Sequence, residues 1–192
     1  MPTTGPWGVG SMINALKLDD ILAVQHVHRW HMIKVRRTQN LAEHTCLVSL
    51  IAAKMASVLS EPLAIEDYAM LLELALTHDI YEIEYGDIPT PTKRVLREAG
   101  HGEVLDTLEK AFWESRGSLY TPRTFTDAPE RVHNLIKLAD LMEAAIFYTT
   151  EGDDVQIKRR LSKDALLHAQ KHFPNDPNLM QLVTRVIFPG EE

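Results

Sequence analysis

The sequence predicts an all-α domain of about six or seven helices, and three observations support this prediction. Apolar residues recur at i, i+3 and i+4 over several long stretches. Proline and glycine fall between these stretches rather than inside them. Alternating apolar and polar runs, which are typical of strands, are nearly absent. The 192 residues, 45% hydrophobic and 24% charged, suit one globular domain with a buried core.

The beginning of the chain is expected to lie outside this domain. Residues 1–11 contain three glycines and two prolines and show no helical period. They predict a flexible arm, or an artificial leader, ahead of a domain that occupies residues 12–192. Asp19 and Asp20 are expected to cap a first helix that runs toward Trp30.

The next part of the chain predicts two amphipathic helices and a loop. The stretch from about 42 to 59 carries one apolar stripe, and Pro62 follows its end. The stretch 66–78 repeats the pattern. The Gly- and Pro-rich segment 86–92 predicts a rigid loop that is not helical.

The second half of the chain predicts further helices with one intervening loop. A polar helix is expected at about 102–115, followed by a Thr- and Pro-rich loop at 119–129. A long helix begins at residue 128 or 129, because proline suits a first helical turn, and Gly152 ends it. Two closing helices are expected near 154–172 and 177–187.

Composition excludes several functional classes. The net charge is −7, from 20 basic and 27 acidic residues, so a nucleic-acid polymer or a membrane surface is not an expected partner. A small anionic substrate stays open, because a pocket needs only local positive charge. The single cysteine, Cys46, excludes a disulfide framework and favours a cytoplasmic location. No apolar run approaches the roughly 18 residues of a membrane span, and no signal peptide opens the chain.

Ionisable residues lie on apolar helical stripes at three separate places. His44 shares a ridge with apolar residues, His78 and Asp79 follow the next apolar stripe, and Asp140 lies on a third. Burying an unpaired polar group costs about 2–7 kcal/mol, whereas a whole domain is stable by only about 5–15 kcal/mol. These groups must therefore satisfy one another or share a cation.

Two histidines and two aspartates form a plausible ligand set for a divalent metal, with Glu82 and Asp87 nearby in sequence. Mixed nitrogen and oxygen ligands without thiolate suit Mn²⁺, Co²⁺, Fe²⁺, Ni²⁺, Mg²⁺ or Zn²⁺. Positions left open for water would make such a site catalytic rather than structural. On the residues alone, hydrogen-bonded core histidines with solvated aspartates are an equally open interpretation.

The spacing of His44, the pair His78-Asp79, and Asp140 resembles the H…HD…D pattern of HD-domain metal-dependent phosphohydrolases. The surrounding motifs resemble the YfbR-like 5′-deoxynucleotidase branch, which includes bacteriophage dATP triphosphohydrolases. These motifs are Arg29-Trp30, Ala42-Glu43-His44, residues 78–82, residues 86–91, and residues 137–140. The likeness covers about residues 20–175, and it implies an HD-domain helical bundle.

The resemblance implies a role for each acidic and imidazole group. It makes His44, His78, Asp79 and Asp140 the ligands of a divalent ion, for which Co²⁺, Mn²⁺, Mg²⁺ and Zn²⁺ are the candidates. Glu82 would orient or deprotonate the attacking water. Asp87 would act as the acid for the leaving oxygen or through a second ion near Glu82 and Asp87. Structurally, the alternatives are a solvated helix-end charge for Glu82 and a turn residue for Asp87.

On the substrate side, the resemblance makes Arg29 and Thr90 phosphate-binding residues. Trp30 would pack on the deoxyribose and leave no room for a 2′-hydroxyl. Met32 is expected to line the base pocket or the core. Lys93, with the basic residues 34, 36, 37 and 94, would add positive charge near a polyphosphate, or form a solvated basic face. The structural alternatives are a surface ion pair for Arg29 and a core position for Trp30.

The expected reaction is metal-assisted attack of water on the α-phosphorus of a 2′-deoxynucleotide, which releases the deoxynucleoside. The favoured prediction is a 5′-deoxynucleotidase that releases phosphate from a deoxynucleoside monophosphate. The alternative is a dNTP (dATP) triphosphohydrolase that releases tripolyphosphate, and a regulatory HD hydrolase of a signalling nucleotide is more distant. A metal-stabilised binding module without catalysis also stays open. The resemblance further implies a homo-oligomer, most simply a dimer, in a bacterial cytoplasm or in the host cytoplasm of a phage.

Overall fold

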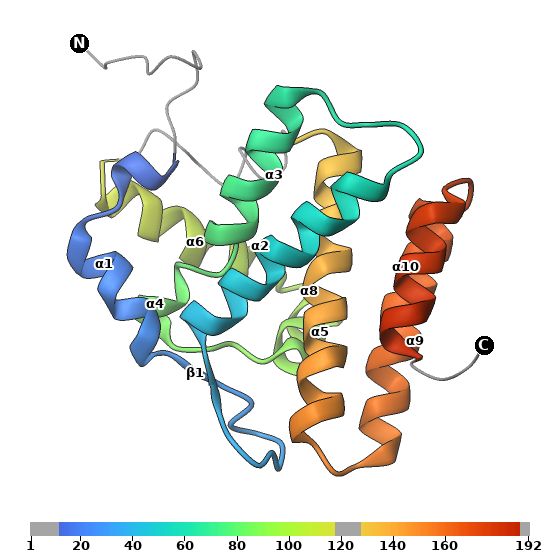
Figure 1. The fold of residues 1–192 in the computed structure, drawn as a ribbon. Coiled ribbons are helices and arrows are strands. Elements are labelled where there is room, and N and C mark those ends of the chain that lie inside the picture. The colour runs from blue at the N-terminus through green and yellow to red at the C-terminus, as the bar shows by residue number, and fades with distance from the viewer. Residues whose placement is uncertain (1–11, 118–127, 189–192) are drawn as a thin grey trace.

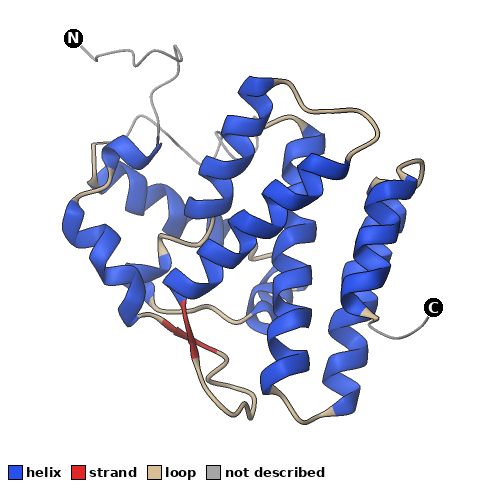
Figure 2. Ribbon diagram, viewed as in Figure 1, coloured by secondary structure: helices blue, strands red, loops and turns tan. Residues whose placement is uncertain are grey.

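The computed structural model describes residues 12–117 and 128–188, and this part of the chain is an all-α fold (Figures 1 and 2). The expected arm at 1–11 and most of the expected loop at 119–129 lie outside the described residues. The helices are η1 (Met12–Ala15), α1 (Leu18–Ala23), η2 (Val24–His26), α2 (Leu41–Val58), α3 (Ile65–Thr77), α4 (Glu82–Tyr85), α5 (Thr90–Glu98), α6 (Glu103–Ser115), α8 (Glu130–Glu151), α9 (Val155–His172) and α10 (Pro177–Ile187). Two two-residue strands, β1 (His28–Arg29) and β2 (Gln39–Asn40), form an antiparallel pair.

The longer helices begin and end close to their predicted residues, and they build the core. The 22-residue helix α8 packs against both α2 and α9, and α2 also packs against α3 (Figure 1). Their facing sides bury large side chains completely, among them Met55, Leu71 and Leu135. Each such side chain contributes about 1.5–3 kcal/mol on burial. This rigid packing holds α2, α3 and α8 in a fixed arrangement.

Helix α2 is long and apolar enough to cross a membrane by length and composition alone. The Asn40 side chain caps its first turn by accepting a hydrogen bond from the backbone N–H of Glu43 at 2.9 Å. The helix also packs between α3 and α8 and carries the fully buried His44. A helix at the centre of a bundle passes the same length and composition test.

The first predicted helix has its expected start, but its predicted end is wrong. Asp20 caps the helix from its third position, since its side chain accepts from the backbone N–H of the N-cap residue Lys17 at 2.9 Å. The same carboxylate pairs with Arg116 at 2.7 Å. Helix α1 ends at Ala23, well before Trp30. The chain extends there because His28 and Arg29 pair with the segment that leads into α2.

The segment 86–92 is helical at its end, which corrects the prediction of a loop throughout. Gly86 ends α4 with a positive φ of 78°, a conformation that favours glycine. Helix α5 then begins at Thr90, and its proline lies in the first turn, where no backbone N–H is needed. The short helices α4 and α5 explain why the fold has more helices than the six or seven expected.

Stability should depend on pH through His168, which is partly buried on α9. Burial lowers the pKa of His168 from 6.5 to about 4, and the nearby His172, Lys137 and Lys171 add to this effect. The folded state therefore resists protonation, so stability present above pH 6.5 is lost as the pH falls toward 4.

Replacing this ring tests the effect. Between pH 7.5 and 5, the free energy of unfolding should fall by about 1 kcal/mol less in His168→Gln than in the wild type, because the variant lacks the titrating ring. This value is already reduced for solvent screening. Urea unfolding at the two pH values measures it. Equal losses in the wild type and the variant would contradict it.

Candidate active site

Three helices bring a group of potential metal ligands together at the centre of the bundle. His44 on α2, His78 at the end of α3 and Asp140 on α8 each offer one ligand atom, and these atoms lie within 4.8 Å of one another. The two Nε2 atoms of His44 and His78 are 3.3 Å apart. Asp140 Oδ1 is 3.6 Å from His44 Nε2. The packing of α2, α3 and α8 therefore positions this group.

Hydrogen bonds on the far side of both rings leave the facing nitrogens as acceptors. Nδ1 of His78 donates to the carbonyl oxygen of Ala75 at 2.9 Å, and Nδ1 of His44 donates to Glu143 Oε2 at 2.8 Å. Burial also lowers the pKa of His78, which favours the neutral ring. Two nitrogen lone pairs and a carboxylate then point at one place, so the donor set fits a divalent cation.

Asp79 lies beside this group but has cationic partners of its own. Its Oδ2 is 3.5 Å from His78 Nε2 and 3.8 Å from His44 Nε2. The same oxygen accepts from Arg29 Nη1 at 2.8 Å, and Oδ1 accepts from Lys93 Nζ at 3.2 Å. Burial disfavours the charge, yet Lys93, His78 and Arg29 together hold the pKa of Asp79 well below its usual range. Its role as a fourth ligand stays a prediction.

Glu82 is fully buried and has one free oxygen. Its Oε1 accepts from Lys93 Nζ at 2.9 Å and from the backbone N–H of Ile88 at 3.3 Å. Its Oε2 has no hydrogen-bond partner in the described structure, with Arg29 Nη1 at 3.8 Å. Burial and the charge of Asp79 raise the pKa of Glu82 to about 8. A buried oxygen without a partner costs about 1–3 kcal/mol, so this atom is suited to bind a water and take its proton.

Asp87 lies within 4 Å of nitrogen atoms of two other side chains. Its Oδ2 is 3.3 Å from His31 Nδ1, and its Oδ1 is 3.8 Å from Arg29 Nη1. Glu82 likewise has Lys93 as a partner. Within residues 12–117 and 128–188, no group of three potential ligands forms around these two carboxylates. The second ion expected near Glu82 and Asp87 therefore has no support from the ligand geometry.

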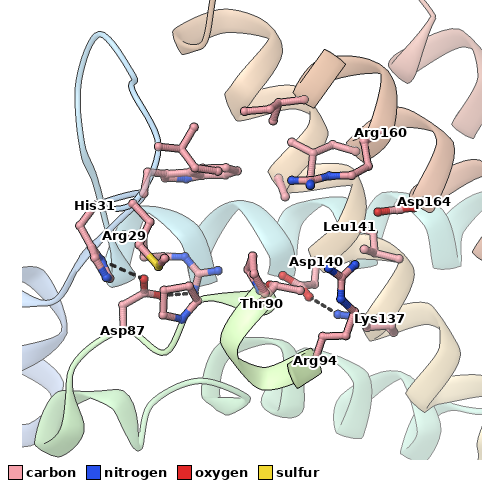
Figure 3. Close-up of a pocket in the computed structure, with 18 residues that line it drawn as sticks. Arg29, His31, Asp87, Thr90, Arg94, Lys137, Asp140, Leu141, Arg160 and Asp164 are labelled. Carbon is pink, nitrogen blue, oxygen red and sulfur yellow. Dashed lines mark hydrogen bonds and ion pairs between the residues drawn. The ribbon is translucent and has the colours of Figure 1, made fainter. Parts of the chain in front are cut away.

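A pocket of about 370 Å³ opens beside the ligand group, between the loop at 29–33, the start of α5, and helices α8 and α9 (Figure 3). Seven of the candidate site residues from the sequence are among the described residues that line it: Arg29, Trp30, Met32, Asp87, Thr90, Arg94 and Asp140. Apolar side chains from α8 and α9 complete its wall, including Leu141, Ile157 and Leu161. Lys93 is not part of this lining and instead binds Asp79 and Glu82. A pocket with an apolar wall and a polar floor suits a nucleotide.

Trp30 is held in the pocket wall by several contacts. It has a φ of 68°, which is strained for a bulky residue. Its indole stacks on Phe147 at 5.3 Å and lies 5.6 Å from the Tyr148 ring. Its Nε1 donates to Gln39 Oε1 at 3.2 Å. The ring is half-buried rather than part of the core, and it also lines the pocket.

Among the described residues, three cations line the pocket besides Arg29, and two of them are available to a ligand (Figure 3). Lys137 Nζ binds Asp140 Oδ2 at 2.7 Å. Arg94 has only a 3.8 Å contact with Glu98, and both side chains are largely exposed. Arg160 forms no ion pair within the described part of the chain. The sequence around Arg160 does not mark it as a site residue, because only the packing of α9 on α8 brings this side chain to the pocket.

The basic residues before α2 do not reach this pocket. Arg36 pairs with Asp153, and Arg37 pairs with Glu43 and Glu151. The expectation that these residues add charge near a polyphosphate is therefore wrong for Arg36 and Arg37. They fasten the loop before β2 to the end of α8, where the backbone N–H of Arg36 also donates to the carbonyl oxygen of Glu151.

Known proteins resemble this chain in sequence and fold. A family model described as "5′-deoxynucleotidase YfbR-like" matches residues 18–154. The chain is 32% identical over 154 residues to a dATP triphosphohydrolase of Acinetobacter phage SH-Ab 15497, covering 73% of this chain and 70% of that protein. It is 23% identical over 159 residues to the 5′-deoxynucleotidase YfbR of Escherichia coli O1:K1 / APEC, covering 76% and 78%.

A solved structure shares the fold. It is that of a Cyanophage S-2L HD phosphohydrolase (DatZ) bound to dA and one catalytic Zn²⁺ ion. The TM-score is 0.67 at 22% identity, and the match covers 90% of this chain and 96% of that chain. At this identity the likeness is one of fold.

Proposed function

The chain belongs to the YfbR-like family of HD phosphohydrolases, and from this premise we propose that it hydrolyses 2′-deoxynucleoside triphosphates to deoxynucleoside and tripolyphosphate. The family makes it a deoxynucleotide phosphohydrolase, which sets aside a binding module without catalysis. The phage triphosphohydrolase is more similar to it than the bacterial monophosphatase, at 32% against 23% identity. This difference favours a triphosphate substrate over the monophosphate that the motifs alone predict. The expected dimer and cytoplasmic location stay predictions.

The observation that carries the proposal is the set of cations around the pocket. Arg94, Lys137 and Arg160 line it in addition to Arg29, which faces the catalytic carboxylates. A triphosphate carries about twice the charge of a monophosphate and needs more cationic partners. Guanidinium groups suit this task, because each can bind two phosphate oxygens at once.

His44, His78 and Asp140 are the residues that would hold the metal, with Asp79 adjacent. A bound divalent ion would supply an activated water and neutralise phosphoryl charge. The cyanophage neighbour contains Zn²⁺, so Zn²⁺ is to be tested beside Co²⁺, Mn²⁺ and Mg²⁺.

Glu82 and Asp87 are proposed to move the protons. Glu82 Oε2, the oxygen without a partner, accepts a proton from the attacking water, while Lys93 fixes Oε1. The water oxygen bonds to the α-phosphorus, and the bond from that phosphorus to O5′ breaks. The proton that O5′ takes up comes from the pair of Asp87 Oδ2 and His31 Nδ1, which lie 3.3 Å apart on the pocket wall.

The nucleoside is proposed to lie against the apolar wall. One face of the Trp30 ring packs on Phe147, which holds the ring in place. The sugar would therefore contact a rigid surface. This arrangement supports the proposal that Trp30 leaves no room for a 2′-hydroxyl. Met32 is 64% exposed at the pocket and is placed to contact the base. The phosphates then extend toward Thr90 at the start of α5.

Charge removal at the pocket tests the proposal. Arg160→Ala should lower kcat/KM for dATP by about 10–100-fold, the value of a charge-assisted hydrogen bond. The same variant should leave kcat/KM for dAMP nearly unchanged. Steady-state kinetics with both nucleotides measures the ratio.

Arg159→Ala is the matched control, because Arg159 is a neighbouring exposed arginine that does not line the pocket. It should change neither value. A loss of equal size for dATP and dAMP in Arg160→Ala would contradict the proposal and favour the 5′-deoxynucleotidase.

A further inference from the structure

A continuous line of hydrogen bonds joins the pocket wall to the metal-ligand group. Trp30 Nε1 donates to Gln39 Oε1 at 3.2 Å. Gln39 Nε2 donates to Glu143 Oε1 at 2.5 Å. Glu143 Oε2 accepts from His44 Nδ1 at 2.8 Å, and His44 Nε2 belongs to the ligand group. Four side chains from two separate segments and two helices thus form one bridge.

The middle of this bridge is buried. Gln39 and His44 are 0% exposed, and Glu143 is 2% exposed. No lysine or arginine of the described ranges lies within ion-pair distance of the Glu143 carboxylate. An uncompensated buried carboxylate is costly. A cation on the far side of His44 would compensate it, in the carboxylate–histidine–metal arrangement that orients many metal-bound imidazoles.

The backbone holds both ends of the bridge in place. Gln39 pairs directly with Arg29 in the β1–β2 ladder, so it lies next to Trp30. Helix α2 begins two residues after Gln39, and His44 lies in its first turns. The strained backbone of Trp30 needs such support, because a bulky side chain at φ 68° persists only where its surroundings hold it.

We infer that Gln39 and Glu143 are positioning residues that fix His44 as a ligand through Nε2 and hold Trp30 at the pocket wall. The metal site and the wall that meets the sugar are thereby oriented as one unit. The inference rests on the metal site of the proposed function and not on its nucleotide substrate.

Metal binding tests the inference without any turnover. Protein freed of metal by a chelator is titrated with Co²⁺, and the visible absorption of the bound ion is followed. Glu143→Gln should weaken Co²⁺ binding by about 10–100-fold. Glu151→Gln is the matched control on the same helix, since Glu151 binds Arg37 away from the ligands, and it should bind Co²⁺ as the wild type does. Unchanged affinity in Glu143→Gln would overturn the inference, whether or not any nucleotide is hydrolysed.

A spectroscopic readout separates positioning from loss of structure. The ¹⁵N shifts of His44 in the metal-free wild type should show the proton on Nδ1. In Glu143→Gln the amide can donate to Nδ1, so the proton should move in part to Nε2, the atom required for the metal. A single Nδ1–H form in both proteins would contradict the assigned role.

A second variant covers the case in which Glu143→Gln does not fold. Gln39→Met keeps the length of the side chain and removes both of its hydrogen bonds, while Glu143 still contacts His44. It should weaken Co²⁺ binding by about 2–10-fold, the value of one hydrogen bond. It should also change the environment of the Trp30 indole N–H in the proton spectrum. If neither value changes, Gln39 is not part of a positioning bridge.

Discussion

Glu82→Gln is expected to lower kcat for a deoxynucleoside triphosphate by a factor of about 10²–10⁴, with Co²⁺ binding retained. The substitution keeps the shape of a fully buried side chain, but an amide cannot take the proton that Oε2 is placed to accept. The Oε1 contacts with Lys93 and the Ile88 N–H can persist through the amide oxygen. Single-turnover kinetics and a Co²⁺ titration measure the two quantities.

Glu84→Gln provides the control for this prediction. Glu84 lies on the same short helix and makes an ion pair with Arg116 outside the pocket. Its replacement should leave kcat unchanged. A Glu82→Gln enzyme with more than a tenth of wild-type turnover would show that another group accepts the proton.

Asp140→Asn is expected to weaken Co²⁺ binding by at least about 100-fold and to abolish turnover. Changing a residue that only orients a metal ligand already costs about 10–100-fold, so loss of a charged ligand should reach or exceed the upper value. Asp140 faces His44 Nε2 at 3.6 Å, and its other oxygen binds Lys137. The pair with Lys137 is partly exposed. The free energy of unfolding of the metal-free protein should therefore change by less than about 1 kcal/mol.

Asp164→Asn is the matched control for Asp140→Asn. Asp164 lines the same pocket but does not belong to the ligand group. It should leave Co²⁺ affinity at the wild-type value. Equal affinities in Asp140→Asn and the wild type would show that Asp140 is not a ligand.

Local sequence patterns were sufficient to predict the long helices. The apolar stripe of α2 and the proline and glycine around α8 predict elements that the structure contains within about two residues. The pattern failed where tertiary contacts decide the conformation. Helix α1 ends at Ala23, and the pairing of β1 with β2 extends a segment that propensity alone would leave helical.

The site could be predicted only in part, for a related reason. His44, His78 and Asp140 stand out because each is ionisable on an apolar stripe, and the structure brings all three together. Glu143, which is buried one turn after Asp140 on α8, carries the same signal in the sequence, although the family pattern does not include it. Arg160 could not be found, because an exposed arginine on a polar helix has no distinguishing pattern until α9 packs beside α8.

The central claim is most directly tested by resolving the products formed from deoxynucleotides. The purified protein is incubated with Zn²⁺, Co²⁺, Mn²⁺ or Mg²⁺ and with dATP, dAMP, ATP and AMP, together with the other deoxynucleotides. The account predicts deoxynucleoside and intact tripolyphosphate from a deoxynucleoside triphosphate, with far less product from ATP. Free phosphate from dAMP, with dATP left intact, would contradict it.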